Sequence, residues 1–226
     1  MKKQVLYSFV ILLLLNFGGT AAAEERKGDV EVTAALKSWV NTWKREAPGT
    51  GNTRSDSSVL IGPAVEVEFP NGPVIEASYL TSLSGYEFTE AGVISEVDRQ
   101  DLDLAIGKRL NRHVGFFMGY RNSSFKEKET GVKEHSYGLF YSLRGTVPAI
   151  GKSSVYANLT WLNTRFKAEN LAREDAPGWT VEIGGKTPFT EQLSMNLGYK
   201  WETTKGRDTQ VKAAFTGMTL DLVYAF

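Results

Sequence analysis

Histidine is the side chain best suited to proton transfer near neutral pH, and the sequence contains two, His113 and His135. A catalytic histidine acts within hydrogen-bond distance of the groups with which it exchanges protons. Asp98, Asp101 and Glu134 are the carboxylates expected nearest to His135. His113 falls in a predicted turn, which leaves His135 as the one catalytic candidate. A lone histidine of this kind is more often a solvated loop residue than a catalyst.

Nucleophilic catalysis and metal chemistry have less support in the sequence. His135 and Ser136 are adjacent, so their side chains point to opposite faces of an extended strand and cannot form a base–nucleophile pair. Ser123 or Ser124, in the preceding segment, would lie nearer to His135. The chain has no cysteine, which excludes disulfides and thiolate metal ligands. We find no metal-ligand cluster and no phosphate-binding glycine loop, and therefore expect neither a metal nor a cofactor.

A larger set of ionisable residues alternates with apolar residues along the chain. About seven are acidic and five basic, so neighbours on adjacent strands can pair if they share an enclosed interior. Such a lumen charge network would either plug the interior or line a narrow path that selects small solutes. Its expected members are Glu66, Glu68, Glu76, Asp103, Arg109, Arg121, Arg144, Glu182, Lys186, Lys200, Glu202 and Asp221.

The elements that carry these residues are predicted to be strands. The sequence repeats runs of about ten to thirteen residues in which large apolar and small or polar residues alternate with period two. The run from residue 191, for example, sets Leu193, Leu197 and Trp201 against Ser194 and Lys200. Ten such runs begin near residues 34, 57, 73, 97, 113, 133, 153, 178, 191 and 215.

The connections between the runs alternate between short and long. Residues 71–73, 111–113, 148–152 and 187–192 form short turns, whereas residues 46–56, 85–95, 125–132, 167–178 and 203–213 form longer polar connections. Transmembrane β-barrels sort their connections in this way, with short periplasmic turns and longer extracellular loops. The pattern predicts a closed antiparallel barrel with ten strands, or eight as the alternative. Its apolar faces would contact lipid, and aromatic residues near the run ends would form interfacial girdles.

The last residues of the chain end this pattern on an aromatic residue. Leu220, Leu222, Tyr224 and Phe226 alternate with smaller or polar residues. This ending resembles the closing strand of the small bacterial outer-membrane β-barrel superfamily. The resemblance covers nearly all of the mature sequence. It implies recognition of the last strand by the barrel-assembly machinery, contact with outer-membrane lipid and lipopolysaccharide, and location in the bacterial outer membrane.

The N-terminal residues predict export. Lys2 and Lys3 precede an apolar segment and the small residues Ala21 to Ala23, which together are typical of a cleaved signal peptide over residues 1–23. A short segment, residues 24–33, would lead into the barrel domain, residues 34–226. The run over residues 34–45 fits an amphipathic helix as well as a strand. We favour a strand, because a bacterial single-chain barrel has an even number of strands.

Charge excludes one class of partner, and the function is left among three readings. Without Lys2 and Lys3 the chain carries 24 basic and 26 acidic residues and no basic stripe, so nucleic acid is not expected as a partner. The favoured reading is a non-catalytic envelope barrel with a largely plugged polar interior. A narrow channel and a rim enzyme are the alternatives. Omptin proteases have ten strands, and lipid A deacylases are small barrels, but residues 133–136 reproduce no omptin motif.

Overall fold

The computed structural model describes residues 30–46, 48, 53–70, 72–90, 93–169 and 172–226. The predicted signal peptide and residues 24–29 lie outside the described residues. Among those described, no helix is long and apolar enough to cross a membrane. The strands are β1 (Glu31–Glu46), β2 (Thr53–Glu68), β3 (Pro73–Ser82), β4 (Tyr86–Glu90), β5 (Val93–Arg109), β6 (Val114–Glu127), β7 (Lys133–Pro148), β8 (Ser154–Ala168), β9 (Glu174–Asp175), β10 (Gly178–Pro188), β11 (Leu193–Lys205) and β12 (Lys212–Ala225).

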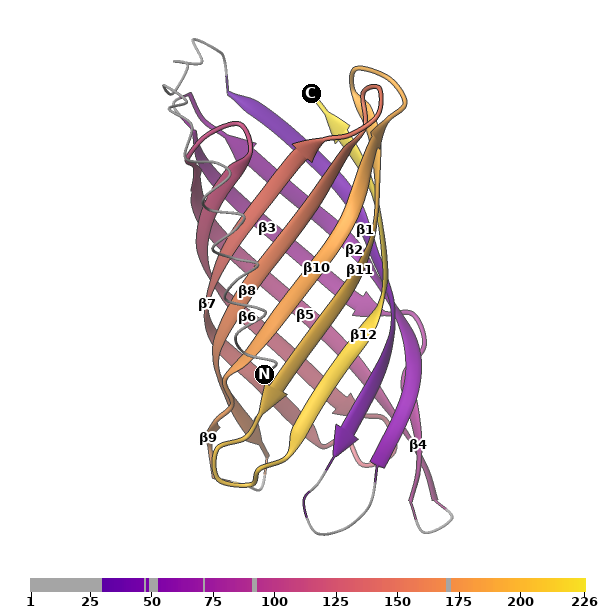
Figure 1. The fold of residues 1–226 in the computed structure, drawn as a ribbon. Coiled ribbons are helices and arrows are strands. Elements are labelled where there is room, and N and C mark those ends of the chain that lie inside the picture. The colour runs from indigo at the N-terminus through magenta and orange to yellow at the C-terminus, as the bar shows by residue number, and fades with distance from the viewer. Residues whose placement is uncertain (1–29, 47, 49–52, 71, 91–92, 170–171) are drawn as a thin grey trace, which may run out of the picture.

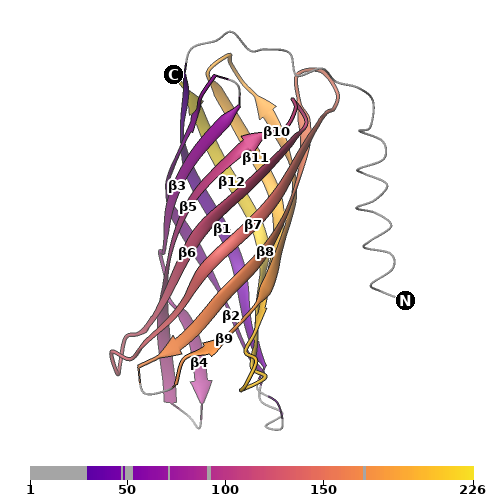
Figure 2. The ribbon, with the colours of Figure 1, turned by 90° about the vertical axis from the view of Figure 1, so that its left-hand side faces the viewer.

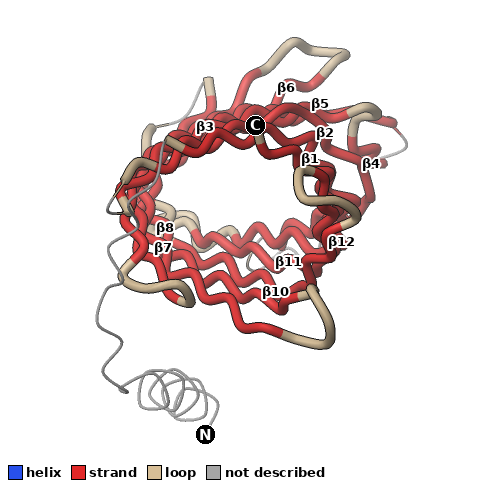
Figure 3. Tube along the Cα trace, turned by 90° about the horizontal axis from the view of Figure 1, so that it is seen from above, coloured by secondary structure: helices blue, strands red, loops and turns tan. Residues whose placement is uncertain are grey.

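Ten of these strands form one antiparallel sheet that closes on itself. Its order is β10-β11-β12-β1-β2-β3-β5-β6-β7-β8, and pairing of β8 with β10 completes the ring. The first and last strands pair from Thr33 with Ala225 to Glu46 with Lys212. Figures 1 and 2 show the tilted strands, and Figure 3 shows a flattened ring seen along the axis. The predicted closed barrel of ten strands is confirmed, and the eight-stranded alternative is wrong.

The two ends of the barrel differ. The C-terminus lies at one end, with the short connections over residues 149–153 and 189–192, and we call this the turn end (Figure 1). Strands β4 and β9 lie at the opposite end, the loop end (Figure 1). In outer-membrane barrels the short turns are periplasmic and the long loops are extracellular. The two ends therefore correspond to the periplasmic and extracellular sides of such a barrel.

Strand β1 resolves the ambiguity over residues 34–45 in favour of a strand. Leu36 and Val40 face outward and are each 52% exposed, whereas Trp39 and Trp43 face the lumen and are 1% and 4% exposed. Apolar residues on both faces of one strand give the helix-like spacing, since each face contributes its own period-two series. The lumen thus receives two large aromatic side chains from β1.

Strands β4 and β9 carry the wall beyond the predicted strand ends. Both β3 and β4 pair with β5, so they are two halves of one wall strand interrupted at residues 83–85. Likewise β9 pairs with the end of β8 and continues into β10 through Ala176 and Pro177. The predicted loops 85–95 and 167–178 therefore contain strand, and β5 is 17 residues long. Backbone pairing in a hairpin does not stop where the apolar surface stops, because it needs only a partner strand.

Apolar side chains cover the outside of the wall. Leu197, Leu220 and Leu222, which two stacked sheets would bury, are 46%, 45% and 47% exposed. Tyr224 and Phe226 continue this outward row. Such an exterior is stable in hydrocarbon, and the wall satisfies its backbone hydrogen bonds internally, as a membrane-spanning barrel must. The predicted girdle residues are exposed as well: Tyr79, Trp161, Trp179, Tyr199, Trp201 and Tyr224.

Candidate functional site in the barrel lumen

Five charged side chains occupy the lumen toward the turn end, and we call them the turn-end network. Arg109 donates from Nη2 to Glu66 at 2.8 Å and from Nε to Glu68 at 2.7 Å. Arg144 forms a two-point ion pair with Glu76, in which Nη2 lies 2.8 Å from Oε2. Two-point pairs of this kind fix both position and orientation of the guanidinium. These contacts join side chains from β2, β3, β5 and β7.

A second set of charges, the central network, crosses the lumen. Glu202 of β11 accepts from Arg99 Nη2 at 2.9 Å and from Arg121 Nη1 at 2.5 Å. Arg99 also donates from Nε to Asp101 at 2.9 Å, and Arg121 donates to both oxygens of Asp103 at 2.7 and 2.6 Å. Strands β5 and β6 stand far from β11 in the order of the ring. The network therefore connects opposite walls of the barrel.

An aromatic cluster packs against the central network. The ring of Trp43 stacks on that of Phe215, with a centroid distance of 5.4 Å and an angle of 20° between the planes. The guanidinium carbon of Arg99 lies 3.9 Å from the centroid of the Phe215 ring. Cation–π contact of this kind is strengthened by exclusion of water. The cluster consists of Trp39, Trp43, Leu60, Tyr86, Phe88, Phe125 and Phe215, all buried.

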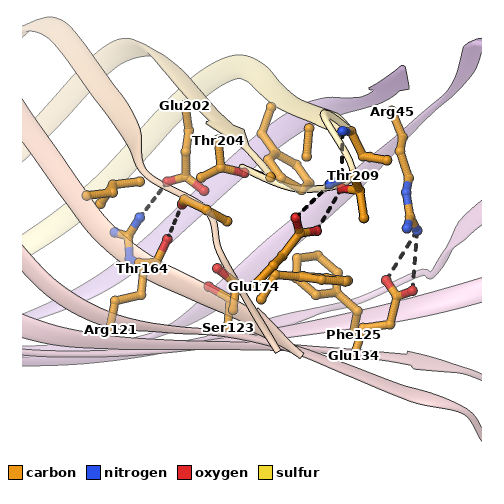
Figure 4. A pocket seen from close by; sticks show the side chains of 18 of the residues that line it. Arg45, Arg121, Ser123, Phe125, Glu134, Thr164, Glu174, Glu202, Thr204 and Thr209 are labelled. Atoms are coloured by element: carbon orange, nitrogen blue, oxygen red, sulfur yellow. Dashed lines mark hydrogen bonds and ion pairs between the residues drawn. The ribbon is translucent and has the colours of Figure 1, made fainter. Parts of the chain in front are cut away.

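A cavity of about 350 Å³ lies between these side chains and the loop end (Figure 4). Trp43, Phe125 and Phe215 form an aromatic wall, and Leu162 adds an aliphatic surface. Arg121 and Glu202 of the central network also line the cavity, where Figure 4 shows their ion pair. We call this space the mouth cavity. It combines an apolar wall with charged groups that already have partners.

Glu174 of β9 joins two segments at one side of the mouth cavity through hydrogen bonds. Its Oε2 accepts from the amides of Asp208 and Thr209, both at 3.0 Å, and its Oε1 accepts from the Thr209 hydroxyl at 2.7 Å (Figure 4). Burial raises the pKa of the Glu174 carboxyl, but these hydrogen bonds outweigh it and lower the pKa below its ordinary value. The ionised carboxylate thus ties β9 to the hairpin between β11 and β12.

The structure brings nine of the twelve predicted lumen residues together in ion pairs. Of the other three, Glu182 accepts hydrogen bonds from Tyr156 at 3.1 Å and Thr219 at 3.0 Å. Asp221 is half-buried, and Lys186 is exposed toward the turn end. The residues found in ion pairs are Glu66, Glu68, Glu76, Asp103, Arg109, Arg121, Arg144, Lys200 and Glu202.

The catalytic candidate His135 lies on the outer face of β7. Its neighbours Glu134 and Ser136 line the mouth cavity, and adjacent residues of a strand point to opposite faces. Glu134 is bound to Arg45 inside the barrel, with a distance of 3.2 Å between Arg45 Nη1 and Glu134 Oε2. Asp101 likewise faces the lumen, and Ser124 is the cross-strand neighbour of His135 on the outer face.

His113 lies in the turn between β5 and β6. Its Nδ1 is 3.0 Å from the backbone oxygen of Thr146, and its Nε2 accepts from Arg112 at 2.9 Å. These contacts place it at the turn end, away from the mouth cavity. Within the described ranges, no group of three or more histidine, aspartate or glutamate side chains is arranged to hold a metal ion.

Several residues of the site were missed by sequence reasoning. Arg99 and Asp101 precede Asp103 in the same period-two series of β5, so this register would have assigned both to the lumen. The lumen position of Trp39 and Trp43 could not be predicted, because both faces of β1 carry large apolar residues. Alternation alone does not distinguish an aromatic residue that plugs a lumen from one that contacts lipid.

Comparison with family models and with curated proteins finds no match. Among solved structures, the outer membrane protease OmpT from Escherichia coli is similar over 92% of this chain and 99% of its own, with 11% identity and a TM-score of 0.59. A Pseudomonas aeruginosa FadL homologue matches 88% of this chain and 90% of its own, with 8% identity and a TM-score of 0.39. Ail, the attachment invasion locus protein of Yersinia pestis, matches 88% of this chain and 100% of its own, with 13% identity and a TM-score of 0.38. The likeness to OmpT extends to the fold alone, which is that of a bacterial outer-membrane β-barrel.

Proposed function

We propose that this outer-membrane β-barrel is a non-catalytic envelope protein with a plugged lumen, which presents its loop end at the cell surface without conducting solutes. The observation that carries the proposal is the position of Glu202, held by Arg99 and Arg121 from the opposite wall. A barrel of ten strands is narrow enough for side chains to fill, because the diameter grows with strand number and about eight strands leave an interior that side chains just occupy.

The charges of the central network support closure rather than selection. Arg99 and Glu202 have side chains only 1% and 5% exposed, and each is neutralised by a neighbour. A hydrated ion crossing this level would have to separate buried ion pairs, and separation leaves uncompensated charges in a poorly solvated interior. Lys200 adds a third cation to Arg99 and Arg121. Three carboxylates, those of Asp101, Asp103 and Glu202, face these cations, so this part of the lumen has no net charge that would attract solutes of one sign.

The outward position of His135 supports the non-catalytic part of the proposal. The His135 side chain lies on the opposite face of the wall from the mouth cavity, so a substrate held in that cavity would not contact it. Asp101 and Glu134, two of the carboxylates expected near it, are bound to Arg99 and Arg45 in the lumen. Asp98, the third, is paired with Lys128. Among the described residues, no hydrogen bond joins His135 to its neighbour Ser124 or to a carboxylate, so the general acid–base arrangement expected for a rim enzyme is not assembled there.

Planar lipid bilayers test the proposal. The full-length protein, folded in detergent and inserted into the bilayer, should give no discrete conductance steps. A general porin inserted in the same bilayers is the control for detection. Reproducible openings of the wild-type barrel would overturn the plug, and loss of a lipase or protease activity on His135→Ala would overturn the non-catalytic assignment.

A further inference from the structure

We propose that the mouth cavity is a binding site for a small, uncharged and largely apolar molecule of one or two rings. The site lies at the loop end, so the molecule would enter from the extracellular side. The inference goes beyond the proposed function, because binding in this cavity does not depend on whether the lumen is closed below it.

The wall of the cavity fits a flat apolar molecule. Trp43, Phe125 and Phe215 stand close together, with centroid distances of 5.2 Å from Trp43 to Phe125 and 6.0 Å from Phe125 to Phe215. The planes of Phe125 and Phe215 differ by 21°, and Trp43 is tilted by 36° from Phe125. Rings arranged in this way offer stacking or edge contacts to a further ring. Leu162 and Ala176 complete the apolar lining.

The charges around the cavity balance, which argues for an uncharged occupant. Arg45 is paired with Glu134 at 3.2 Å, and Arg121 is paired with Glu202 at 2.5 Å. At these four side chains, a charged ligand would have to displace one of the partners to be neutralised. The charged lining residues are four cations and four anions, Arg45, Arg99, Arg121, Arg173, Glu134, Glu174, Glu202 and Asp208.

The size of the cavity limits the ligand. A volume of about 350 Å³ is at the lower end of the range of roughly 300–1,000 Å³ that is typical of small-molecule sites. It admits a fused pair of rings and excludes a folded peptide or a lipid with several acyl chains. Coumarin has two rings and no charge, and it is a suitable probe.

Isothermal titration calorimetry of the full-length barrel in nanodiscs tests the inference, with empty nanodiscs subtracted to remove partition into lipid. Coumarin should bind saturably to one site per barrel. Val211→Trp, which fills the cavity from the rim hairpin, should abolish this binding. Coumarin-3-carboxylate, of similar shape but charged, should bind at least tenfold more weakly. Heat-modifiable migration on gels verifies that each variant is folded.

A matched pair of variants isolates the aromatic wall. Trp43→Leu removes an aromatic ring that lines the cavity, and should weaken coumarin binding about tenfold. Trp39→Leu makes the same change in the same cluster, but Trp39 does not line the cavity, so affinity should stay within about twofold. Indane, a second uncharged ring pair, should show the same pattern.

The inference is overturned if coumarin gives no saturable heat above empty nanodiscs, or if Val211→Trp binds it as the wild type does. Equal effects of the Trp43 and Trp39 substitutions would contradict the assigned aromatic wall, and tighter binding of the carboxylate would show an anion site instead. Conductance is measured separately. A conducting barrel that binds coumarin would overturn only the proposed function, and a silent barrel that does not bind it would overturn only this inference.

Discussion

Arg99 and Glu202 meet across the lumen with Arg99 Nη2 at 2.9 Å from Glu202 Oε1, although 103 residues separate them in the chain. The pair joins β5 to β11, which are distant in the order of the ring. A buried ion pair costs desolvation of both members, so its contribution is largest when one member is removed and the other is left unpaired. The central network therefore provides a direct test of how the lumen is held together.

Glu202→Ala should destabilise the barrel strongly. It leaves Arg99 and Arg121 with one carboxylate fewer in the interior, and the loss in the free energy of unfolding should be about 3–5 kcal/mol. Urea unfolding in detergent, followed by heat-modifiable migration, measures it. The control Glu191→Gln changes an exposed residue of a turn and should stay within about 0.5 kcal/mol. Equal stability of the two variants would contradict a role for the network in the fold.

Gly217→Ala should prevent proper closure of the barrel. A Cβ at Gly217 would lie 1.9 Å from the backbone oxygen of Val40, in the pairing between β12 and β1. Because the obstacle is backbone, no side-chain movement relieves it. Gly145→Ala is the matched control, since its nearest neighbours lie at 3.9 Å. The folded fraction after refolding in detergent should fall sharply for Gly217→Ala alone, and comparable yields would disprove the clash.

The contact between Glu174 and the hairpin over residues 206–211 should weaken in acid. The pKa of Glu174 is lower in the folded protein than in the unfolded chain, so its stabilising contribution is complete above the unfolded pKa and is lost as the pH falls through the folded value. Hydrogen-exchange protection of the Asp208 and Thr209 amides should decrease over that interval. In Glu174→Gln the pH dependence should disappear, and protection in the wild type that is constant across the acid range would refute the assignment.

Lipid contact at β12 can be tested with a single charge. Leu220→Lys places an ammonium group on the outward face and should cost about 2–4 kcal/mol if this position lies near the bilayer midplane. The same substitution at Leu83, exposed in the interruption between β3 and β4 at the loop end, should cost less than about 0.5 kcal/mol. Unfolding from lipid vesicles rather than detergent is the appropriate measurement. Equal costs would mean that Leu220 does not face hydrocarbon.

The sequence contained enough information for the wall but not for the contents of the barrel. Strand starts lie within four residues of those predicted, because period-two alternation depends only on local chemistry. The meeting of Arg99 with Glu202 depends on the curvature and stagger of the closed ring, which alternation does not encode. Trp43 shows the same limit, because its place in the mouth cavity follows from Phe215 on the neighbouring strand and Phe125 across the lumen.

The pairing of β1 with β12 also constrains how the protein is made. The strand that appears first during synthesis obtains one of its two neighbours only when the final strand has been delivered. Until then both open borders of the sheet expose hydrogen-bonding groups to any passing β-strand. The unfolded chain must therefore be kept from pairing with other strands until β12 is present. A chain that ends before β12 cannot form a shorter closed barrel and leaves an open sheet that is prone to aggregate.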